Sequence, residues 1–308
     1  MPAINATESF EKRRAMSDKL SEAAALRLLQ ASTRKTREYA DLTKRVAFVA
    51  TSYDTAFEPI AAQVSARIAQ LSSDYDPNGS LHWSLWIVDD LPSECGFYRR
   101  VLDGFDSHQS LLEANRLHCL RLTSVKRQRR GLKGRAILDG FRAALAADPQ
   151  LDAVVYINLN LKVNTAYAAS GIFAILSDRF DVAVGSRWMG DGGLIIGGGR
   201  LDRAKSRIFS RLARAALPPL RDFMDPNAPM KVFSRHAAQL MIDVACIEHT
   251  NFDCEWLLIA ETAKLRLFRF PVVWVQRPGS KLPWLDVPRA LYDVVKIRRR
   301  WKAGDLLG

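Results

Sequence analysis

The chain has 308 residues, and 48% of them are hydrophobic, which argues against a disordered protein and allows a sizeable core. The formal net charge of +12 favours an anionic partner, such as a phosphorylated substrate, a nucleic acid or an anionic membrane surface. The scattered cysteines have no C-x-x-C spacing, which argues against a zinc cluster and is typical of a reducing cytoplasm. The sequence predicts no membrane-spanning helix and no secretory signal.

The first segment of the chain, residues 1–44, is polar and charged. Apolar residues between Leu20 and Leu29 recur with partial helical spacing, which predicts one or two amphipathic helices. A solvated extension is the alternative for residues 1–10. We therefore treat residues 1–44 as an N-terminal helical extension.

From Arg45 onwards, apolar strands alternate with helical patterns. This order predicts an α/β fold over residues 45–283, with a mainly parallel, Rossmann-like sheet flanked by helices. The expected strands are Val46–Thr51, Leu85–Val88, Leu117–Leu122, Ala153–Ile157, Val182–Gly185, Met230–Phe233 and Leu265–Val273. The expected helices include Phe57–Leu71, Gly134–Ala146 and Tyr167–Leu176.

The C-terminal segment, residues 284–308, contains a basic amphipathic helix at Pro288–Trp301. Its apolar residues alternate with arginine and lysine at helical spacing. Such a helix can lie on an anionic membrane surface. The alternative is a docked terminal helix with a solvated basic face, and the sequence leaves both open.

Polar side chains follow three of the expected strands. In α/β sheets, ligands bind outside the carboxyl ends of the strands, so we expect these side chains to share one site. An aspartate at any one of these positions could equally form a turn or cap a helix. The residues are Thr51, Tyr53 and Asp54 after the first strand, Asp89 and Asp90 after the second, and Asn158 and Asn160 after the fourth.

Further landmarks follow in order along the chain. They are Lys133-Gly-Arg-Ala136, Gly185-Ser-Arg-Trp188, Asp225 with Lys231-Val-Phe233, Phe252-Asp-Cys-Glu-Trp256 and Arg277-Pro-Gly-Ser-Lys281. With the residues at the strand ends, this series resembles a family 2 glycosyltransferase of GT-A fold, in particular the polyprenyl-phosphate (dolichol-phosphate) mannosyl and glucosyl synthases. The resemblance covers roughly residues 45–300 and implies the fold of nucleotide-diphospho-sugar transferases.

The resemblance implies a nucleotide-sugar site at the strand ends. Tyr53 and Asp54, together with Asp89 and Asp90, would hold the base and the ribose, because carboxylates accept hydrogen bonds from ribose hydroxyls and base N–H groups. Thr51 belongs to the same expected site.

At Asn158-Leu-Asn160 the family carries Asp-x-Asp, two carboxylates that hold a divalent metal. Magnesium binds through carboxylates, phosphates and water, whereas an asparagine offers one neutral carbonyl oxygen. We therefore expect no metal ligand here and no essential cofactor. Two alternatives stay open. Other carboxylates could hold Mg²⁺ or Mn²⁺, or the protein could bind a ligand without catalysing transfer.

Basic residues near the same site could neutralise a diphosphate instead. Lys133 precedes a helix N-terminus that suits phosphate, and Lys162 lies on the same side as Asn158 and Asn160 if the segment stays extended. The alternatives are a solvated basic loop at Lys133 and a turn that directs Lys162 to water. The resemblance places further cations near the donor phosphates, namely Arg187, Arg203, Arg277 and Lys281.

Three carboxylates are candidates for the acceptor side, and with Arg187 they are our candidates for catalysis. Asp225 lies where the family has Asp-Thr-x-x-Gly before its Lys-x-Phe, although Pro226 and Pro229 replace the usual small residues here. Asp253 or Glu255 could be the general base for a hydroxyl acceptor, whereas a phosphate acceptor needs none. For Asp253 the alternative is an N-cap of a helix at Glu255–Ala263.

We therefore expect an inverting glycosyltransferase that moves a sugar from a UDP- or GDP-linked donor to a polyprenyl phosphate or a small soluble acceptor. We expect a cytoplasmic protein, with a peripheral contact to the anionic inner membrane face, and leave a homodimer open. The alternative is a catalytically degenerate GT-A protein that binds a nucleotide or a protein partner. Net charge alone favours nucleic acid, but no recognised nucleic-acid motif supports it.

Overall fold

The computed structural model describes residues 23–32, 34, 44–52, 57–76, 78, 81–89, 113–114, 116–121, 133–197, 200–249, 251–276 and 286–307. Within these segments, the side chains of residues 52, 57–62, 89, 119–121, 189, 200–203, 205 and 286–287 lie outside the description. Residues 23–32 are helical, in agreement with the helix expected there. Among the described residues, no helix is both long and apolar enough to cross a membrane.

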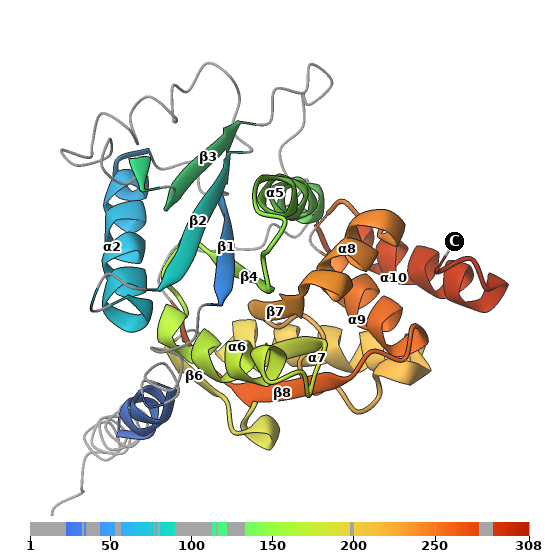
Figure 1. Cartoon of the computed structure of the whole chain (residues 1–308). Helices are drawn as coiled ribbons and strands as arrows, with labels where there is room; N and C mark the ends of the chain where they lie inside the picture. The colour runs from blue at the N-terminus through green and yellow to red at the C-terminus, as the bar shows by residue number, and fades with distance from the viewer. Residues whose placement is uncertain are drawn as a thin grey trace, which may run out of the picture.

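The core of the fold is a seven-stranded sheet in the order β3-β2-β1-β4-β7-β5-β8 (Figure 1). Strand β7 runs antiparallel to both of its neighbours, β4 and β5, and the other pairs are parallel. The predicted α/β fold with a mainly parallel sheet is therefore confirmed. The strands are β1 (Arg45–Ser52), β2 (His82–Asp89), β3 (Leu117–Arg121), β4 (Ala153–Asn158), β5 (Val182–Ser186), β7 (Met230–Ser234) and β8 (Leu267–Pro271).

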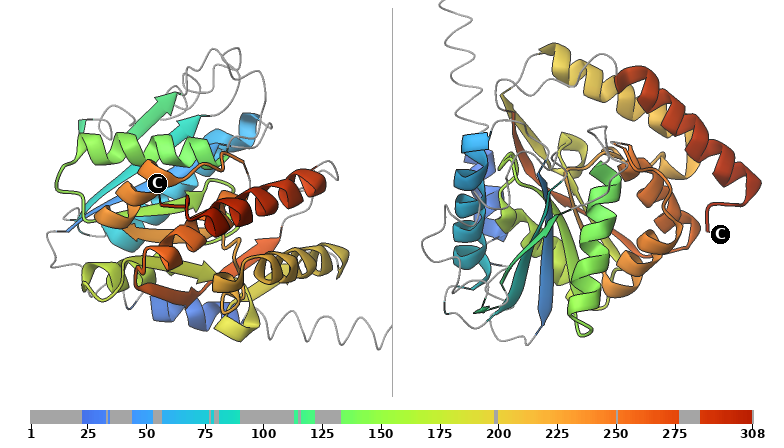
Figure 2. Two further views of the ribbon diagram at one scale, coloured as in Figure 1. Left: turned by 90° about the vertical axis from the view of Figure 1, so that its right-hand side faces the viewer. Right: turned by 90° about the horizontal axis from the view of Figure 1, so that it is seen from above.

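Helices cover both faces of the sheet (Figures 1 and 2). In β1, Ala47 and Val49 pack into one buried cluster with α5, while Phe48 packs into the other with α2, because side chains alternate along a strand. The helices are α2 (Phe57–Tyr75), α5 (Lys133–Ala147), α6 (Ala168–Leu176), α7 (Arg200–Ala216), α8 (Arg235–Val244), α9 (Phe252–Thr262) and α10 (Asp286–Ala303).

Strand register brings the expected site together at one edge of the sheet. Thr51 pairs with Asn158 across β1 and β4, and Ser52 pairs with Asp89 across β1 and β2. The carboxyl ends of these parallel strands therefore lie side by side, as the sequence predicts.

The local structure differs from the expected strands in two places. The single strand expected at Leu265–Val273 is divided into β8 and a separate strand, β9 (Val273–Gln276). Proline has no N–H to donate to a ladder, and Pro271 ends β8. A further strand, β6 (Leu194–Gly197), is absent from the strands expected from the sequence, and it pairs in parallel with β9.

Candidate active site

The chain turns sharply after β4. Asn158 accepts a hydrogen bond from the Tyr156 hydroxyl at Oδ1 (2.9 Å), and its Nδ2 donates to the Pro229 carbonyl (3.3 Å). Asn160 Oδ1 accepts from the Lys162 backbone N–H (3.3 Å), and Leu161 between them has a left-handed φ of 54°. We call residues 158–162 the β4 turn. Its two asparagine side chains are engaged in local hydrogen bonds.

The described residues near this turn do not fit a divalent metal. Among the described part of the chain, no group of three or more His, Cys, Asp or Glu side chains is placed to hold a metal ion. The Asn158 Nδ2 donates a hydrogen bond to the Pro229 carbonyl, so this end of the amide is not an oxygen ligand. Hard cations prefer carboxylate oxygen, and the nearby carboxylates of Asp225 and Asp253 are paired with basic side chains.

Lys162 ends the β4 turn in a buried position. The turn means that the extended geometry considered for Asn158, Asn160 and Lys162 does not form. Lys162 nevertheless does not point to water, because only 8% of its surface is exposed. Its ammonium nitrogen lies 5.3 Å from the centroid of the Trp274 ring.

Arg187 follows β5 and is locked against Asp225. Its Nε and Nη2 atoms donate to the two carboxylate oxygens at 2.8 and 2.7 Å, and its backbone N–H donates to the same carboxylate at 3.0 Å. The Asp225 side chain is fully buried. The guanidinium also donates to the Asn227 carbonyl at 3.0 Å and lies 5.2 Å from the centroid of Trp274. This planar, bidentate arrangement suits arginine and not lysine.

Lys133 opens α5 and lies over aromatic rings. Its Nζ is 5.2 Å from the ring centroid of Tyr156 and 5.9 Å from that of Phe252. Gly134 permits the start of α5 to lie close to Phe252 and Ile247. A Cβ at position 134 would lie 2.7 Å from Phe252 Cβ and 2.6 Å from the Ile247 carbonyl oxygen. The helix start is therefore pressed against α9, with the lysine beside the β4 strand.

Asp253 is paired with a buried lysine. Lys231, which is fully buried on β7, donates to Asp253 Oδ1 and to the Ala228 carbonyl (2.8 Å). The N-cap position of α9 is occupied by Asn251, so Asp253 is not the N-cap considered from the sequence. Burial raises the pKa of Asp253, while the neighbouring Lys231 and Lys133 act to lower it.

Four basic side chains meet here, and we call them the cation cluster: Lys133, Lys162, Arg187 and Lys231. The last three lie close enough to Lys133 to disfavour its charge. Burial first, and then these cations, lower the pKa of Lys133 to about 8, although Asp253 opposes the shift. Among the described side chains, these four cations face two carboxylates, those of Asp225 and Asp253, which leaves a formal excess of two positive charges. Such a buried excess favours binding of an anion with two or more charges.

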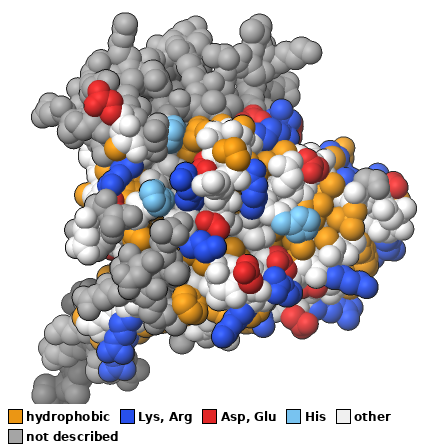
Figure 3. Space-filling view, in the orientation of Figure 1, with side chains coloured by type: hydrophobic (Ala, Val, Ile, Leu, Met, Phe, Trp, Pro, Cys, Tyr) orange, Lys and Arg blue, Asp and Glu red, His pale blue; other side chains and the backbone are white. Residues whose placement is uncertain are grey.

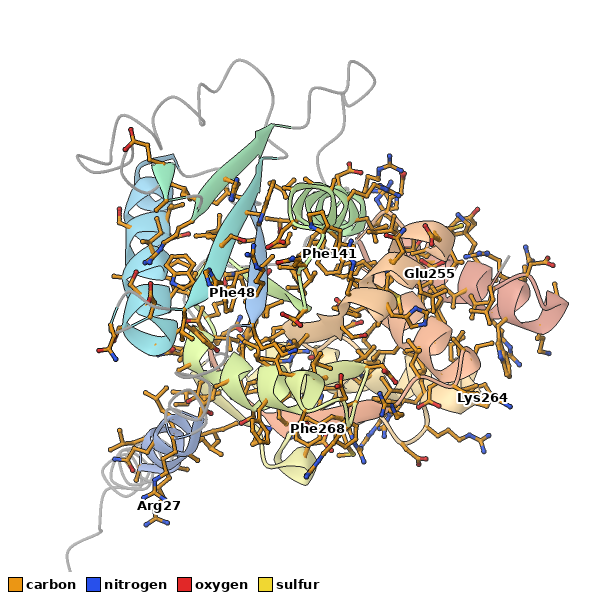
Figure 4. All side chains as sticks on the ribbon, viewed as in Figure 1. Arg27, Phe48, Phe141, Glu255, Lys264 and Phe268 are labelled. Atoms are coloured by element: carbon orange, nitrogen blue, oxygen red, sulfur yellow. The ribbon has the colours of Figure 1, made fainter. Side chains whose placement is uncertain are left out.

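Glu255, two residues after Asp253, has a structural environment. Its carboxylate accepts hydrogen bonds from the backbone N–H groups of Cys246 and Ile247 and from the guanidinium of Arg300 (2.6 Å). It lies where α8, α9 and α10 meet (Figure 4). Because these donors use both carboxylate oxygens, we interpret Glu255 as an anchor for the C-terminal helix.

The remaining predicted site residues are only partly described. Thr51 is buried at the end of β1, and its Oγ1 has no hydrogen-bond partner among the described residues. Asp89 ends β2 and Arg203 lies in α7, but their side chains lie outside the description. Five other predicted site residues also fall outside the described residues: Tyr53, Asp54, Asp90, Arg277 and Lys281.

Three residues of the site were not predicted from the sequence. Lys231 belongs to a noted landmark, yet a lysine within a strand gave no sign of its pairing with Asp253. Tyr156 and Trp274 follow the apolar pattern of strands, so their sequence context indicates core residues and not contacts with cations.

Comparison with known proteins agrees with this architecture. No protein-family model matches the sequence. The chain is 29% identical over 170 residues to glycosyltransferase AglD of Haloferax volcanii, a match that covers 55% of this chain. It spans only a quarter (25%) of the length of that curated relative.

Solved structures of glucosyl-3-phosphoglycerate synthase from Mycobacterium tuberculosis superpose on most of the chain. The complex with Mn²⁺, UDP and glucosyl-3-phosphoglycerate has a TM-score of 0.53 at 15% identity, over 84% of this chain and 80% of that one. The complex with Mn²⁺, UDP-glucose and phosphoglyceric acid has a TM-score of 0.52 at 16% identity, with the same coverage. The chain is therefore similar to a glycosyltransferase over part of its sequence, and it shares the fold of glucosyl-3-phosphoglycerate synthase.

Proposed function

We propose that this protein transfers a sugar from a nucleotide-diphosphate donor, and that the cation cluster neutralises the diphosphate. The observation that carries the proposal is the excess of positive charge among the described side chains beside the β4 turn, at the carboxyl ends of the strands. In the resembling family this position holds a metal. The Mn²⁺ and UDP in the glucosyl-3-phosphoglycerate synthase complexes belong to those proteins.

The proposed reaction is a direct displacement. An acceptor oxygen attacks the anomeric carbon of the sugar, the bond from that carbon to the diphosphate oxygen breaks, and its electron pair leaves with the nucleoside diphosphate. Negative charge therefore grows on the leaving group, where fixed cations stabilise the transition state. Arg187, which Asp225 and Asn227 hold in place, is the best pre-oriented of these cations.

The ion pairs of the two carboxylates indicate which kind of acceptor the site suits. Asp253 is bonded to Lys231, and Asp225 is bonded to Arg187. The paired cation opposes protonation of the carboxylate, and a general base must take up a proton. We therefore favour an acceptor that is already anionic, such as a polyprenyl phosphate or a small phosphorylated molecule, because it needs no proton removal before attack.

A membrane-bound acceptor is supported by the surface of α7 and α10. The two helices are in contact and form one outer edge of the molecule (Figure 2). Five large hydrophobic side chains on them are exposed, although each helix also carries exposed arginine or lysine. Hydrophobic and basic side chains adjoin on the side where α10 lies (Figure 3). The five are Ile208 and Leu212 on α7, and Leu291, Tyr292 and Val295 on α10.

We propose that this edge rests on an anionic lipid surface, because a helix face that combines apolar and basic side chains binds such surfaces. Flotation with vesicles of phosphatidylcholine alone, or with added phosphatidylglycerol, tests the idea. The double variant Leu212→Ser/Leu291→Ser should lose at least about half of its binding to the anionic vesicles. Leu26→Ser, at an equally exposed leucine on the N-terminal helix, is the control and should keep it. Equal binding by all three proteins would remove this surface from the proposal.

The activity itself is tested with a panel of UDP- and GDP-sugars. Release of the nucleoside diphosphate and transfer of label are measured with polyprenyl phosphate and with phosphoglycerate as acceptors. Transfer from any donor supports the proposal. Binding of donors without transfer would favour the alternative, a protein that uses the same site only to bind a nucleotide.

A further inference from the structure

Trp274 lies at the point where two members of the cation cluster meet. It belongs to β9 and is partly buried. Lys162 Nζ is 5.3 Å, and Arg187 Cζ is 5.2 Å, from the centroid of its ring. A cation within about 6 Å of an aromatic ring is attracted by the negative charge of the ring face. One indole ring therefore contacts a cation from the β4 turn and a cation from the end of β5.

The ring is held in place by its own neighbours. The indole Nε1 donates to Gln276 Oε1 at 2.7 Å. The next backbone N–H, that of Val275, donates to the carbonyl of Lys162 at 2.8 Å, which ties β9 directly to the β4 turn. Trp274 also pairs with Ile195 in the two-stranded β6–β9 sheet. These contacts fix the position of the ring relative to Lys162.

We propose that Trp274 is a positioning residue that holds Lys162 and Arg187 ready for the donor diphosphate, an inference that rests on the proposed function. Two like charges repel each other, so a site that collects them needs a group that attracts both. A carboxylate would do so by neutralising their charge. An aromatic ring attracts both cations and adds no negative charge of its own to the site. The ring thereby holds Lys162 and Arg187 in position before the donor binds. In a metal site, the ligands hold the metal ion in position in the same way.

Substitution of Trp274 tests the role of the ring. Isothermal titration with inorganic pyrophosphate, UDP and GDP measures binding to the cluster without any need for transfer. Trp274→Leu keeps an apolar side chain and removes the aromatic face, and should weaken pyrophosphate binding by about tenfold. Trp274→Phe keeps an aromatic face and should stay within about threefold of the wild type. Equal losses in both variants would show a role in packing alone and would overturn the inference.

Trp83→Leu is the matched control. Trp83 also has a cation over its ring, with Arg116 Cζ 5.7 Å from the centroid, but it lies at the opposite, amino-terminal end of β2. This variant removes a buried tryptophan far from the carboxyl ends of the strands and should leave pyrophosphate binding unchanged. If it weakens binding as much as Trp274→Leu, the effect is one of general stability and the inference is wrong.

A second measurement covers the case in which Trp274→Leu does not fold. Biosynthetic replacement of tryptophan by trifluorotryptophan withdraws charge from the ring faces with little change of shape. It should weaken pyrophosphate binding in the wild-type sequence and have no effect in Trp274→Phe. An equal effect in both chains would overturn the inference. Failure of the wild type to bind pyrophosphate, UDP and GDP would instead overturn the proposed function.

Discussion

The two asparagines of the β4 turn and the cation cluster are neighbouring parts of one site, but their charges differ. In the turn, Asn158 and Asn160 carry no charge, and their amides are used in local hydrogen bonds. In the cluster, four cations are collected around two carboxylates. A metal site needs negative ligands, whereas a site that binds diphosphate directly needs positive ones. Under the proposed function, the neutral asparagines and the excess of cations among the described side chains are two parts of one arrangement.

The largest expected effect comes from the buried pair within the cluster. Lys231→Met would leave Asp253 buried without its cation, which we expect to destabilise the protein by about 3–5 kcal/mol. Urea denaturation measures the change. The double variant Lys231→Met/Asp253→Asn should recover part of the loss, because no buried charge is left unpaired. A loss below about 1 kcal/mol for the single variant would mean that the pair contributes little.

Restoring one aspartate in the β4 turn should harm the protein and not create a metal site. In Asn158→Asp, a carboxylate oxygen would face the Pro229 carbonyl in place of the donating Nδ2. We expect a loss of about 1–3 kcal/mol in the free energy of unfolding, because a hydrogen bond is replaced by repulsion. Thermal unfolding with and without Mn²⁺ checks both points. Strong stabilisation of this variant by Mn²⁺ would contradict our view of the turn.

Arg187 should contribute to the rate of sugar transfer. Arg187→Lys keeps a charge for Asp225 but loses the planar contact, and should lower turnover by about tenfold, or about 1.4 kcal/mol. Because the effect lies in the transition state, the Michaelis constant should change less. Arg300→Lys is the matched control, because Arg300 is also paired with a buried carboxylate, that of Glu255, outside the cluster. Normal turnover in Arg187→Lys would remove this residue from the mechanism.

The smallest expected effect is a dependence on pH that comes from Lys133. Its pKa is lowered to about 8 in the free protein, and a bound diphosphate, which favours the charged form, would raise it again. Affinity for pyrophosphate should therefore fall as pH rises, by about fivefold between about pH 7 and about pH 9. Lys133→Met should bind more weakly and lose this slope. The same slope in Lys133→Met would assign the titration to another group.

The sequence predicts the fold better than it predicts the site. The order of strands and helices follows from local hydrophobic periodicity, and the meeting of Thr51 with Asn158 follows from parallel pairing. The partners of a buried charge depend on tertiary packing. Asp253 fits the rules for an N-cap, yet β7 brings Lys231 to it. The residues next to Lys162 give no sign of its contact with Trp274, and only the return of β9 places the ring beside it.

We propose that the cation cluster takes the place of a metal, and transfer activity under chelation tests this proposal most directly. Sugar transfer is measured with the best donor of the panel after treatment with EDTA, and again after addition of Mg²⁺ or Mn²⁺. We expect the rate of sugar transfer after EDTA to stay within about twofold of the untreated rate, and added metal not to raise it further. Loss of activity with EDTA, and its recovery with Mn²⁺, would contradict the account and assign the diphosphate to a metal ion.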